Sequence, residues 1–212
     1  MIKHVVWDWN GTLVDDVDLC VDILSQILFS HGKDKISVQI YKNSFFFPVA
    51  KFYASLGLPS DGTKYEQIAE NYISEYRNRF RECSLHPQAI HMVEKLKTWG
   101  ITQSILSAGQ QTDLEHFTSY YGLNNWMSHL DGANHIQATG KEDRVAEHFS
   151  KLNLKANQVL FVGDTFHDLE VAGLVQCRVL LFEQGHCGKE RLERASVPKI
   201  KCLSEVAKWV HD

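Results

Sequence analysis

Short apolar runs that alternate with amphipathic segments constrain the fold of this chain most strongly. The clearest runs lie at residues 2–7, 101–106, 158–162 and 178–182, with weaker ones near 128–131 and 199–203. The first run alternates too little for a half-exposed strand and is too short for a helix, which is typical of a strand buried on both faces. The alternation of strands with helices predicts an α/β fold, in which a Rossmann-like, mostly parallel sheet carries helices on both faces.

The stretch between the first two runs differs from the rest because it has helical patterns and no convincing strand. Apolar residues recur at helical spacing over residues 15–31, and a second amphipathic pattern covers residues 63–81. We therefore expect a small all-helical cap at residues 16–83. It would be inserted after the first strand into a Rossmann-like core formed by residues 1–15 and 84–212.

An aromatic block interrupted by a proline lies within this insert, at residues 41–53. Such blocks most often belong to a core, and we expect Phe45 and Phe52 to be core residues. A block broken by proline can also form a loop that faces a ligand, so both interpretations stay open for Phe47 and Pro48.

Composition is ordinary for a globular protein and argues against several classes of partner. The 212 residues are 44% hydrophobic and 23% charged, with a net charge of -4 and no Lys/Arg-rich stripe, which argues against a nucleic-acid partner. No apolar run approaches the roughly 18 residues that span a membrane, and because the first strand begins almost at once we expect no signal peptide. Five scattered cysteines without a Cys-x-x-Cys pair indicate reduced thiols, so we expect a cytoplasmic protein.

Polar residues follow three of the expected strands at the point where each strand ends. Asp8 follows the first strand, Ser107 follows the second, and Asp164 follows the one at residues 158–162. In a parallel sheet these ends share one edge, so the three side chains can converge there. An isolated Asp-x-Asn-Gly would more often be only a turn, but the later strand ends make Asp8 a candidate nucleophile or metal ligand.

Further charged residues extend this cluster. Asp168 lies four residues after Asp164 and adds a third carboxylate if both lie in one helical turn. Three close carboxylates repel one another unless a cation lies among them, and oxygen ligands with room for water suit Mg²⁺. Lys141, Ser107 and the backbone amides after the first strand together suit the spread charge of a phosphate. Arg144, one turn after Lys141, is the alternative if Lys141 points away.

Two loops at the same sheet edge carry histidines, and we expect only one of the two to lie at the pocket. His186 and Cys187 follow the strand at 178–182 and can rim the pocket. His167 lies between Asp164 and Asp168 and could contact a substrate, but an exposed loop histidine needs no function, and we favour that interpretation.

Four places in the chain resemble the motifs of the haloacid dehalogenase superfamily of phosphatases and related hydrolases. The stretch Asp8-Trp9-Asn10-Gly11-Thr12-Leu13 resembles the first motif, Asp-x-Asp-Gly-Thr, and Gly163-Asp164-Thr165-Phe166-His167-Asp168 resembles the fourth. Ser107 after an apolar strand resembles the second motif, and Lys141 resembles the third. The opening and the cap are most similar to the phosphoglycolate-phosphatase-like branch.

This resemblance implies that the chain is an Mg²⁺-dependent hydrolase of a small phosphorylated metabolite. Asp8 would attack phosphorus and form an aspartyl phosphate that water later hydrolyses. Mg²⁺ would be held by Asp8, by the backbone carbonyl of Asn10, and by Asp164 with help from Asp168.

The resemblance also implies which residues bind the substrate. Ser107 and Lys141 would hold the phosphoryl oxygens, Lys141 would offset charge at the nucleophile, and Thr12 and Ala108 would contact the substrate beside them. In capped members the insert closes over the pocket, so Phe47 would help to choose the substrate. Nothing indicates an obligate coiled-coil or membrane partner, and we expect a monomer or weak homodimer.

Asn10 departs from the family pattern, in which a second aspartate protonates the leaving oxygen and then activates water. An amide can do neither, and such acid–base help is typically worth about 10² to 10⁴ in rate. We therefore expect weak turnover of alkyl phosphates, whereas acyl and aryl phosphates need less protonation. Asn10 can still orient a water, and Asp15 or Asp16, just downstream, is a candidate replacement acid.

Two classes of function follow from these residues. The first is the Mg²⁺-dependent phosphatase, and the second is a catalytically impaired protein that binds or senses a phosphorylated ligand, as Asn10 would allow. A superfamily member that acts on a non-phosphate substrate is a third possibility, which Lys141 and the phosphate-like donor set make less favoured.

Overall fold

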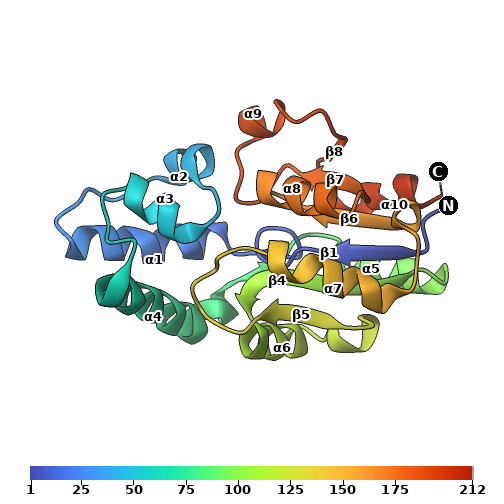
Figure 1. Cartoon of the computed structure of the whole chain (residues 1–212), viewed down its shortest axis with the longest axis horizontal. Coiled ribbons are helices and arrows are strands. Elements are labelled where there is room, and N and C mark those ends of the chain that lie inside the picture. Colours follow the sequence, from blue (N-terminus) through green and yellow to red (C-terminus); the bar gives the residue numbers. More distant parts are fainter. Residues whose placement is uncertain (212) are drawn as a thin grey trace.

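A six-stranded sheet organises the protein, whose computed structural model describes residues 1–211 (Figure 1). The strands of this sheet are β1 His4–Trp7, β4 Thr102–Gln110, β5 Leu130–Ala133, β6 Val159–Gly163, β7 Arg178–Phe182 and β8 Lys199–Ile200. They lie in the order β5-β4-β1-β6-β7-β8, and every neighbouring pair runs parallel. The predicted α/β fold with a mostly parallel sheet is therefore confirmed.

Helices fill most of the chain between the strands. The α-helices are α1 Val17–Ser30, α2 Val38–Ser44, α3 Val49–Ser55, α4 Gly62–Arg79, α5 Ala89–Thr98, α6 Gln111–Tyr120, α7 Glu142–Leu152, α8 Phe166–Leu174, α9 Lys189–Leu192 and α10 Val206–Val210. Short 3₁₀ helices lie at Phe80–Glu82, Asn124–Trp126, Ala156–Gln158 and Leu203–Glu205. None of the helices formed by residues 1–211 has the length and apolarity needed to cross a bilayer.

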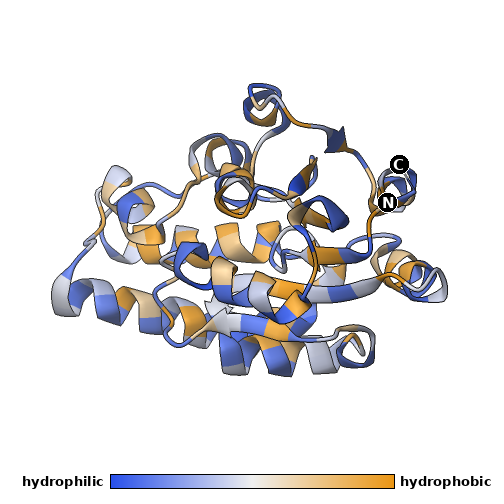
Figure 2. Ribbon diagram, turned by 45° about the vertical axis from the view of Figure 1, so that its right-hand side comes forward, coloured by the Kyte–Doolittle hydropathy of each residue, from blue (hydrophilic) through white to orange (hydrophobic). Residues whose placement is uncertain are grey.

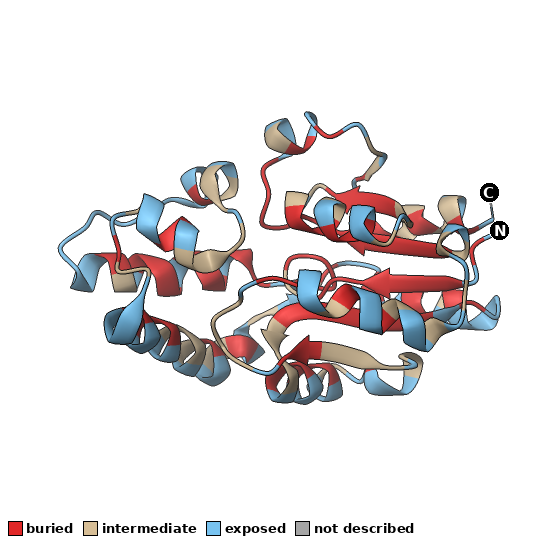
Figure 3. Cartoon of the chain, viewed as in Figure 1, coloured by how far each residue is buried: buried red, intermediate tan, exposed pale blue. Residues whose placement is uncertain are grey.

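Successive strand residues point to opposite sides of the sheet, and side chains on both sides are buried. Trp7 and Leu160 belong to one core cluster, which includes residues of α5, α6 and α10. Val6 and Phe161 belong to the other, with residues of α7 and α8. Figure 3 shows the strands mostly buried and the helices banded, and Figure 2 shows the matching bands of hydropathy along the helices. The helices therefore cover both faces, as an α/β sheet requires.

Helices α1 to α4, which belong to residues 16–83 and are called the helical insert below, gather beside the carboxyl end of β1 (Figure 1). They form a core of their own, which includes Leu24, Phe52, Tyr53 and Ile68. Two short strands, β2 Val14–Asp15 and β3 Ser84–Leu85, pair antiparallel where the chain enters and leaves this segment. The assignment of the segment as a cap stays a prediction.

Several expectations about individual segments differ from the structure. β4 was expected to end at residue 106 but continues to Gln110, because after a register shift Gln110 pairs with Ala133 of β5. Ser107 to Gly109 therefore lie within a strand rather than after it. Phe52 is buried as expected, whereas Phe45 is only partly buried.

The central strands should dominate the stability of the core. We expect Leu160→Ala in β6 to lower the free energy of unfolding by about 3 kcal/mol, because a fully buried leucine leaves a cavity. The matched change Leu174→Ala, at a side chain that is 61% exposed, should stay within about 0.5 kcal/mol. Urea unfolding measures both free energies, and the dependence of each on urea concentration should stay unchanged. Similar losses at the two sites would contradict this description of the core.

Candidate active site

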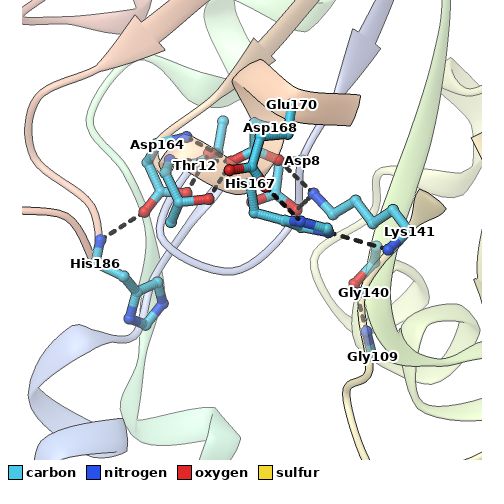
Figure 4. Close-up of polar contacts among 12 residues, drawn as sticks. Asp8, Thr12, Gly109, Gly140, Lys141, Asp164, His167, Asp168, Glu170 and His186 are labelled. Carbon is cyan, nitrogen blue, oxygen red and sulfur yellow. Dashed lines mark hydrogen bonds and ion pairs between the residues drawn. The ribbon is translucent and has the colours of Figure 1, made fainter. Parts of the chain in front are cut away.

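The candidate site lies where the carboxyl ends of β1, β4 and β6 meet the start of α8 (Figure 4). Asp8 comes directly after β1, and its backbone N–H continues the ladder by donating to the Val162 carbonyl at 2.8 Å. This bond fixes the position of the Asp8 backbone beside β6. Its carboxylate is buried and faces Lys141, Asp164 and Asp168.

Lys141 supplies the positive charge of the site. It is the residue before α7, its side chain is 2% exposed, and its Nζ donates to Asp8 Oδ1 and to Asp168 Oδ1, each at 2.6 Å. Burial opposes the charge, but the carboxylates of Asp168 and Asp8 outweigh burial and raise the pKa of Lys141. The ammonium group is therefore held charged between the two acids.

At the start of α8, the backbone of Asp164 is hydrogen-bonded to the side chain of Asp168. Asp168 Oδ2 accepts hydrogen bonds from the N–H groups of Asp164 and Thr165 and from the Thr165 hydroxyl, which leaves Oδ1 for Lys141. Asp164 precedes the helix instead of lying in its first turn, so the expected helical spacing is not what joins the two. The hydrogen bond from the Asp164 N–H to the Asp168 carboxylate joins them instead.

Asp164 is held in place by two further donors. The Thr12 hydroxyl donates to its Oδ1 at 3.0 Å, and the backbone N–H of His186 donates to its Oδ2 at 2.5 Å. Gly11 and Gly185 pass so close to this carboxylate that a Cβ on either would collide with it. Both glycines are therefore needed for the backbone to reach the carboxylate.

The three carboxylates fit a divalent cation. Asp8, Asp164 and Asp168 each offer one oxygen, and these atoms lie within 4.8 Å of one another. Burial raises the pKa of Asp8 most, the negative charge of Asp168 adds to it, and Lys141 offsets only part. Such a crowded, all-oxygen set is chemically suited to Mg²⁺, which would restore the anionic form of Asp8.

The predicted substrate-binding residues fall into two groups. Ser107 and Ala108 line the cavity next to Asp8, and the Ser107 hydroxyl accepts a hydrogen bond from the Gly109 N–H at 3.0 Å. Thr12 does not line the cavity, because its buried side chain lies behind Asp164 and donates to it. Arg144, the alternative to Lys141, donates to the backbone carbonyls of residues 131 and 140 and is also absent from the cavity lining.

Asn10 forms a pair with Asp16, a contact that the sequence did not single out. The Asn10 Nδ2 donates to Asp16 Oδ2 at 2.6 Å and to the hydroxyl of Tyr76 from α4 at 3.1 Å. A carboxylate can only accept, so the amide oxygen of Asn10 is the group left for other partners. Asp15, the other carboxylate considered as a replacement acid, is exposed, with its Oδ2 3.9 Å from the His86 ring.

Asp16 is fully buried yet ionised. Burial opposes its charge, but the nearby His186 ring and the hydrogen bonds from Asn10 and Tyr76 outweigh burial and lower the pKa of Asp16. His186 Nε2 lies 3.2 Å from Asp16 Oδ1, and His186 Nδ1 lies 2.9 Å from the Tyr41 hydroxyl of α2. The pocket-edge position expected for His186 is therefore occupied by an imidazole that links the helical insert to the sheet.

His167 is also more than a loop residue. Its Nε2 accepts a hydrogen bond from the Lys141 N–H at 3.0 Å, which fixes the turn that carries the lysine. Its ring lies 4.6 Å from the Phe47 ring, measured between centroids. The expectation that His167 is an exposed loop residue is wrong, because it lies in α8 and its side chain is buried beside Lys141 and Phe47.

A cavity of about 160 Å³ opens over Asp8 and extends toward the helical insert. Asp8, Ser107 and Lys141 form its polar end, and aromatic side chains such as Phe47 and Tyr72 form much of its wall. Of the two interpretations of Phe47, the structure supports the one that places it beside a ligand pocket.

A comparison with protein-family models identifies one family. The model of the family described as haloacid dehalogenase-like hydrolase matches residues 5–182. Among curated proteins, none matches the sequence.

Solved structures share the fold over nearly the whole chain. A haloacid dehalogenase-like family hydrolase from Streptococcus pneumoniae has a TM-score of 0.80 and 19% identity, with 98% of each chain covered. A predicted phosphoglycolate phosphatase from Haemophilus somnus has a TM-score of 0.76 and 16% identity, with 98% of this chain and 97% of that chain covered. Protein tyrosine kinase A from Mycobacterium tuberculosis has a TM-score of 0.82 and 18% identity, with 100% of this chain and 99% of that chain covered. Such low identities show a shared fold only, so the reaction must be argued from the site.

The lysine between the carboxylates should stabilise the fold. We expect Lys141→Met to lower the free energy of unfolding by about 3–5 kcal/mol without divalent cations, because it leaves buried carboxylates uncompensated. Lys151→Met removes a half-exposed lysine from its pair with Asp131 and should cost less than about 1 kcal/mol.

Chemical denaturation with and without Mg²⁺ checks this expectation. Mg²⁺ should recover part of the loss in Lys141→Met and should leave Lys151→Met unchanged relative to the wild type. Equal losses for the two variants would show that the buried ion pairs contribute little.

Proposed function

Because this chain belongs to the haloacid dehalogenase-like hydrolase family, we propose that it is a phosphatase that hydrolyses a small phosphorylated metabolite. The family predicted from the four motifs and the hydrolase class are confirmed by the match over residues 5–182. The observation that carries the choice of phosphate chemistry is Lys141. This buried cation lies beside the candidate nucleophile Asp8 at one end of a cavity.

The proposed reaction begins at the Asp8 carboxylate, which faces the polar end of the cavity. One carboxylate oxygen attacks phosphorus, the bond to the leaving oxygen breaks, and an aspartyl phosphate forms that water hydrolyses. Lys141 offsets negative charge on the phosphoryl oxygens, while Ser107 provides a hydroxyl beside them. Ser107 is carried by β4 and the Lys141 ammonium is held by two carboxylates, so little reorganisation is needed.

Mg²⁺ is the proposed cofactor, held by Asp8, Asp164, Asp168 and the backbone carbonyl of Asn10. When bound it would neutralise charge on the phosphate and keep Asp8 ionised. The closeness of the three carboxylates and the raised pKa of Asp8 support this proposal.

In the proposed reaction, the Asn10–Asp16 pair provides neither a general acid nor a general base. Asn10 cannot give a proton to the leaving oxygen, and Asp16 is ionised and absent from the cavity lining. Asp16 therefore acts as a positioning residue that orients the Asn10 amide. The Asn10 oxygen can accept a hydrogen bond from an attacking water but cannot take its proton.

The same pair favours a second candidate function, a protein that binds a phosphorylated ligand and turns it over slowly. The bond of the Asn10 amide to Asp16 supports it, because the pair lacks a proton to donate. Action on a non-phosphate substrate is less favoured, because Lys141 and Ser107 suit phosphoryl oxygens.

We also propose a cytoplasmic location and a monomer or weak homodimer. All five cysteines are free thiols, which suits a reducing compartment.

Replacing the nucleophile tests the phosphatase. Phosphate release from acetyl phosphate, phenyl phosphate and phosphoglycolate would be measured with Mg²⁺ for the wild type, Asp8→Asn and Asp18→Asn. We expect Asp8→Asn to lose activity by about 10³-fold or more. Asp18 is an exposed residue of α1, and its variant should keep wild-type rates. If Asp8→Asn matched the wild type on every substrate, the enzyme proposal would be wrong.

Exchanging the two groups of the Asn10–Asp16 pair tests the missing acid. Asn10→Asp alone places a second carboxylate against Asp16, so we expect it to be destabilised by about 1–3 kcal/mol. The double variant Asn10→Asp with Asp16→Asn restores one amide and one carboxylate. Its free energy of unfolding should exceed the value expected from adding the effects of the two single changes by more than about 1 kcal/mol.

Turnover of an alkyl phosphate by the double variant should rise by up to about 10²-fold, because position 10 then carries a titratable acid. Steady-state kinetics and urea unfolding of the three variants measure both quantities. An unchanged alkyl rate would mean that another group already supplies the proton.

A further inference from the structure

The wall of the cavity above Asp8 is built mainly from aromatic side chains of the helical insert. Phe47 comes from the loop between α2 and α3, Tyr53 from α3, and Tyr65 and Tyr72 from α4. The rings pack edge to face, as between Tyr53 and Tyr65, whose centroids lie 6.3 Å apart. A ring that enters this cavity would meet further edges and faces of the same kind, the arrangement that aromatic pairs prefer.

The cavity is poor in free charge away from Asp8. Lys141 is the only lysine or arginine among its lining residues, all of which lie within residues 1–211, and it is already paired with two carboxylates. The other charged groups are paired as well, since Asp113 binds Arg77 at 2.7 Å and His186 faces Asp16. A leaving group with its own carboxylate would therefore lose hydration without gaining a cation.

Three of the five tyrosines that line the cavity have hydroxyls that face protein groups. Tyr65 donates to the Gln137 carbonyl at 3.0 Å, Tyr76 donates to Asp16 at 2.8 Å, and the Tyr41 hydroxyl lies against His186. These three hydroxyls are therefore occupied by the protein, and their rings contribute mainly carbon atoms to the wall.

The size of the cavity fits one ring. Its volume is about 160 Å³. An engineered apolar cavity of about 150 Å³ in another protein stays dry and binds benzene.

The chemistry of the site also favours an aromatic leaving group, and this argument does not depend on the aromatic wall of the cavity. Asn10 cannot protonate the leaving oxygen, so the site favours a leaving group that departs readily as an anion. A phenol has a pKa of about 10, as in the tyrosine side chain, against about 16 for water. A phenolate can therefore leave without an acid far more readily than an alkoxide can.

We propose that the substrate of this site is an aryl phosphate, the phosphate monoester of a single-ring phenol, with its ring in the aromatic cavity. This inference rests on the proposed phosphatase function. The bond from an Asp8 oxygen to phosphorus forms as the bond from phosphorus to the aryl oxygen breaks, and the phenolate leaves with the electron pair and takes a proton from water. Water then attacks the aspartyl phosphate, which releases inorganic phosphate and regenerates the Asp8 carboxylate.

Binding of stable phosphonates separates the cavity from the reactivity of aryl esters. Calorimetric titration of the whole protein with Mg²⁺ would compare phenylphosphonate with methylphosphonate, which share the phosphonate group and differ in the ring. We expect phenylphosphonate to bind about 10-fold more tightly or better, because only it fills the apolar end. Equal affinities would overturn the proposal.

Two neighbouring phenylalanines provide a matched pair of variants. Phe47→Ala, which opens the wall of the cavity, should reduce the preference for phenylphosphonate by about 5-fold or more. Phe46→Ala, at a side chain that is 38% exposed and does not line the cavity, should keep it within about 2-fold. Equal effects of the two changes would overturn the placement of the ring.

Kinetics distinguish this inference from the proposed function. We expect kcat/KM for phenyl phosphate to exceed that for phosphoglycolate by about 10²-fold or more. A higher value for phosphoglycolate would overturn the aryl-phosphate proposal while leaving the phosphatase intact. No phosphate release from either ester, with the phenylphosphonate preference retained, would overturn the phosphatase and with it the substrate, and leave an aromatic ligand pocket.

Discussion

The ammonium group of Lys141, placed 2.6 Å from both Asp8 and Asp168, is the interaction on which the rest of the site depends. Burying three carboxylates at one sheet edge is costly, and their mutual repulsion would favour protonation of Asp8. Lys141 offsets part of that repulsion, and its backbone is fixed by His167. The remaining charge imbalance is what makes this sheet edge suitable for a cation and a phosphate rather than simply a structural ion-pair cluster.

A second buried pair, Asp16 with His186, lies beside the first. The Asn10 amide connects the two, because its backbone follows Asp8 while its side chain donates to Asp16. A carboxylate at position 10 would face Asp16 directly, so the buried acid at position 16 accounts physically for an amide at position 10. The acid–base group expected of the family is thereby exchanged for a fixed amide, which does not titrate, beside the candidate nucleophile Asp8.

The helical insert contributes to the site through several contacts of different kinds. Tyr41 reaches His186, Tyr76 reaches Asp16, and Arg77 binds Asp113 at the start of α6. The aromatic wall between these contacts is apolar, so the insert fixes the polar network at its edges and leaves an uncharged space above Asp8. The proposed binding of an uncharged ring and the proposed reaction without an acid both rest on this arrangement, in which the charged groups lie at the Asp8 end of the cavity.

The sequence by itself determined the parallel α/β sheet, because short apolar runs ending in polar residues fit little else. It also determined that Asp8, Ser107 and Asp164 share one edge. It could not decide which way side chains point: Thr12 faces Asp164 rather than the cavity, Lys141 rather than Arg144 enters the site, and Asp16 rather than Asp15 is buried beside Asn10. These choices depend on contacts between residues more than 100 positions apart, or on one-residue differences in backbone direction. Local periodicity carries no information about either, so only the packed tertiary structure could decide them.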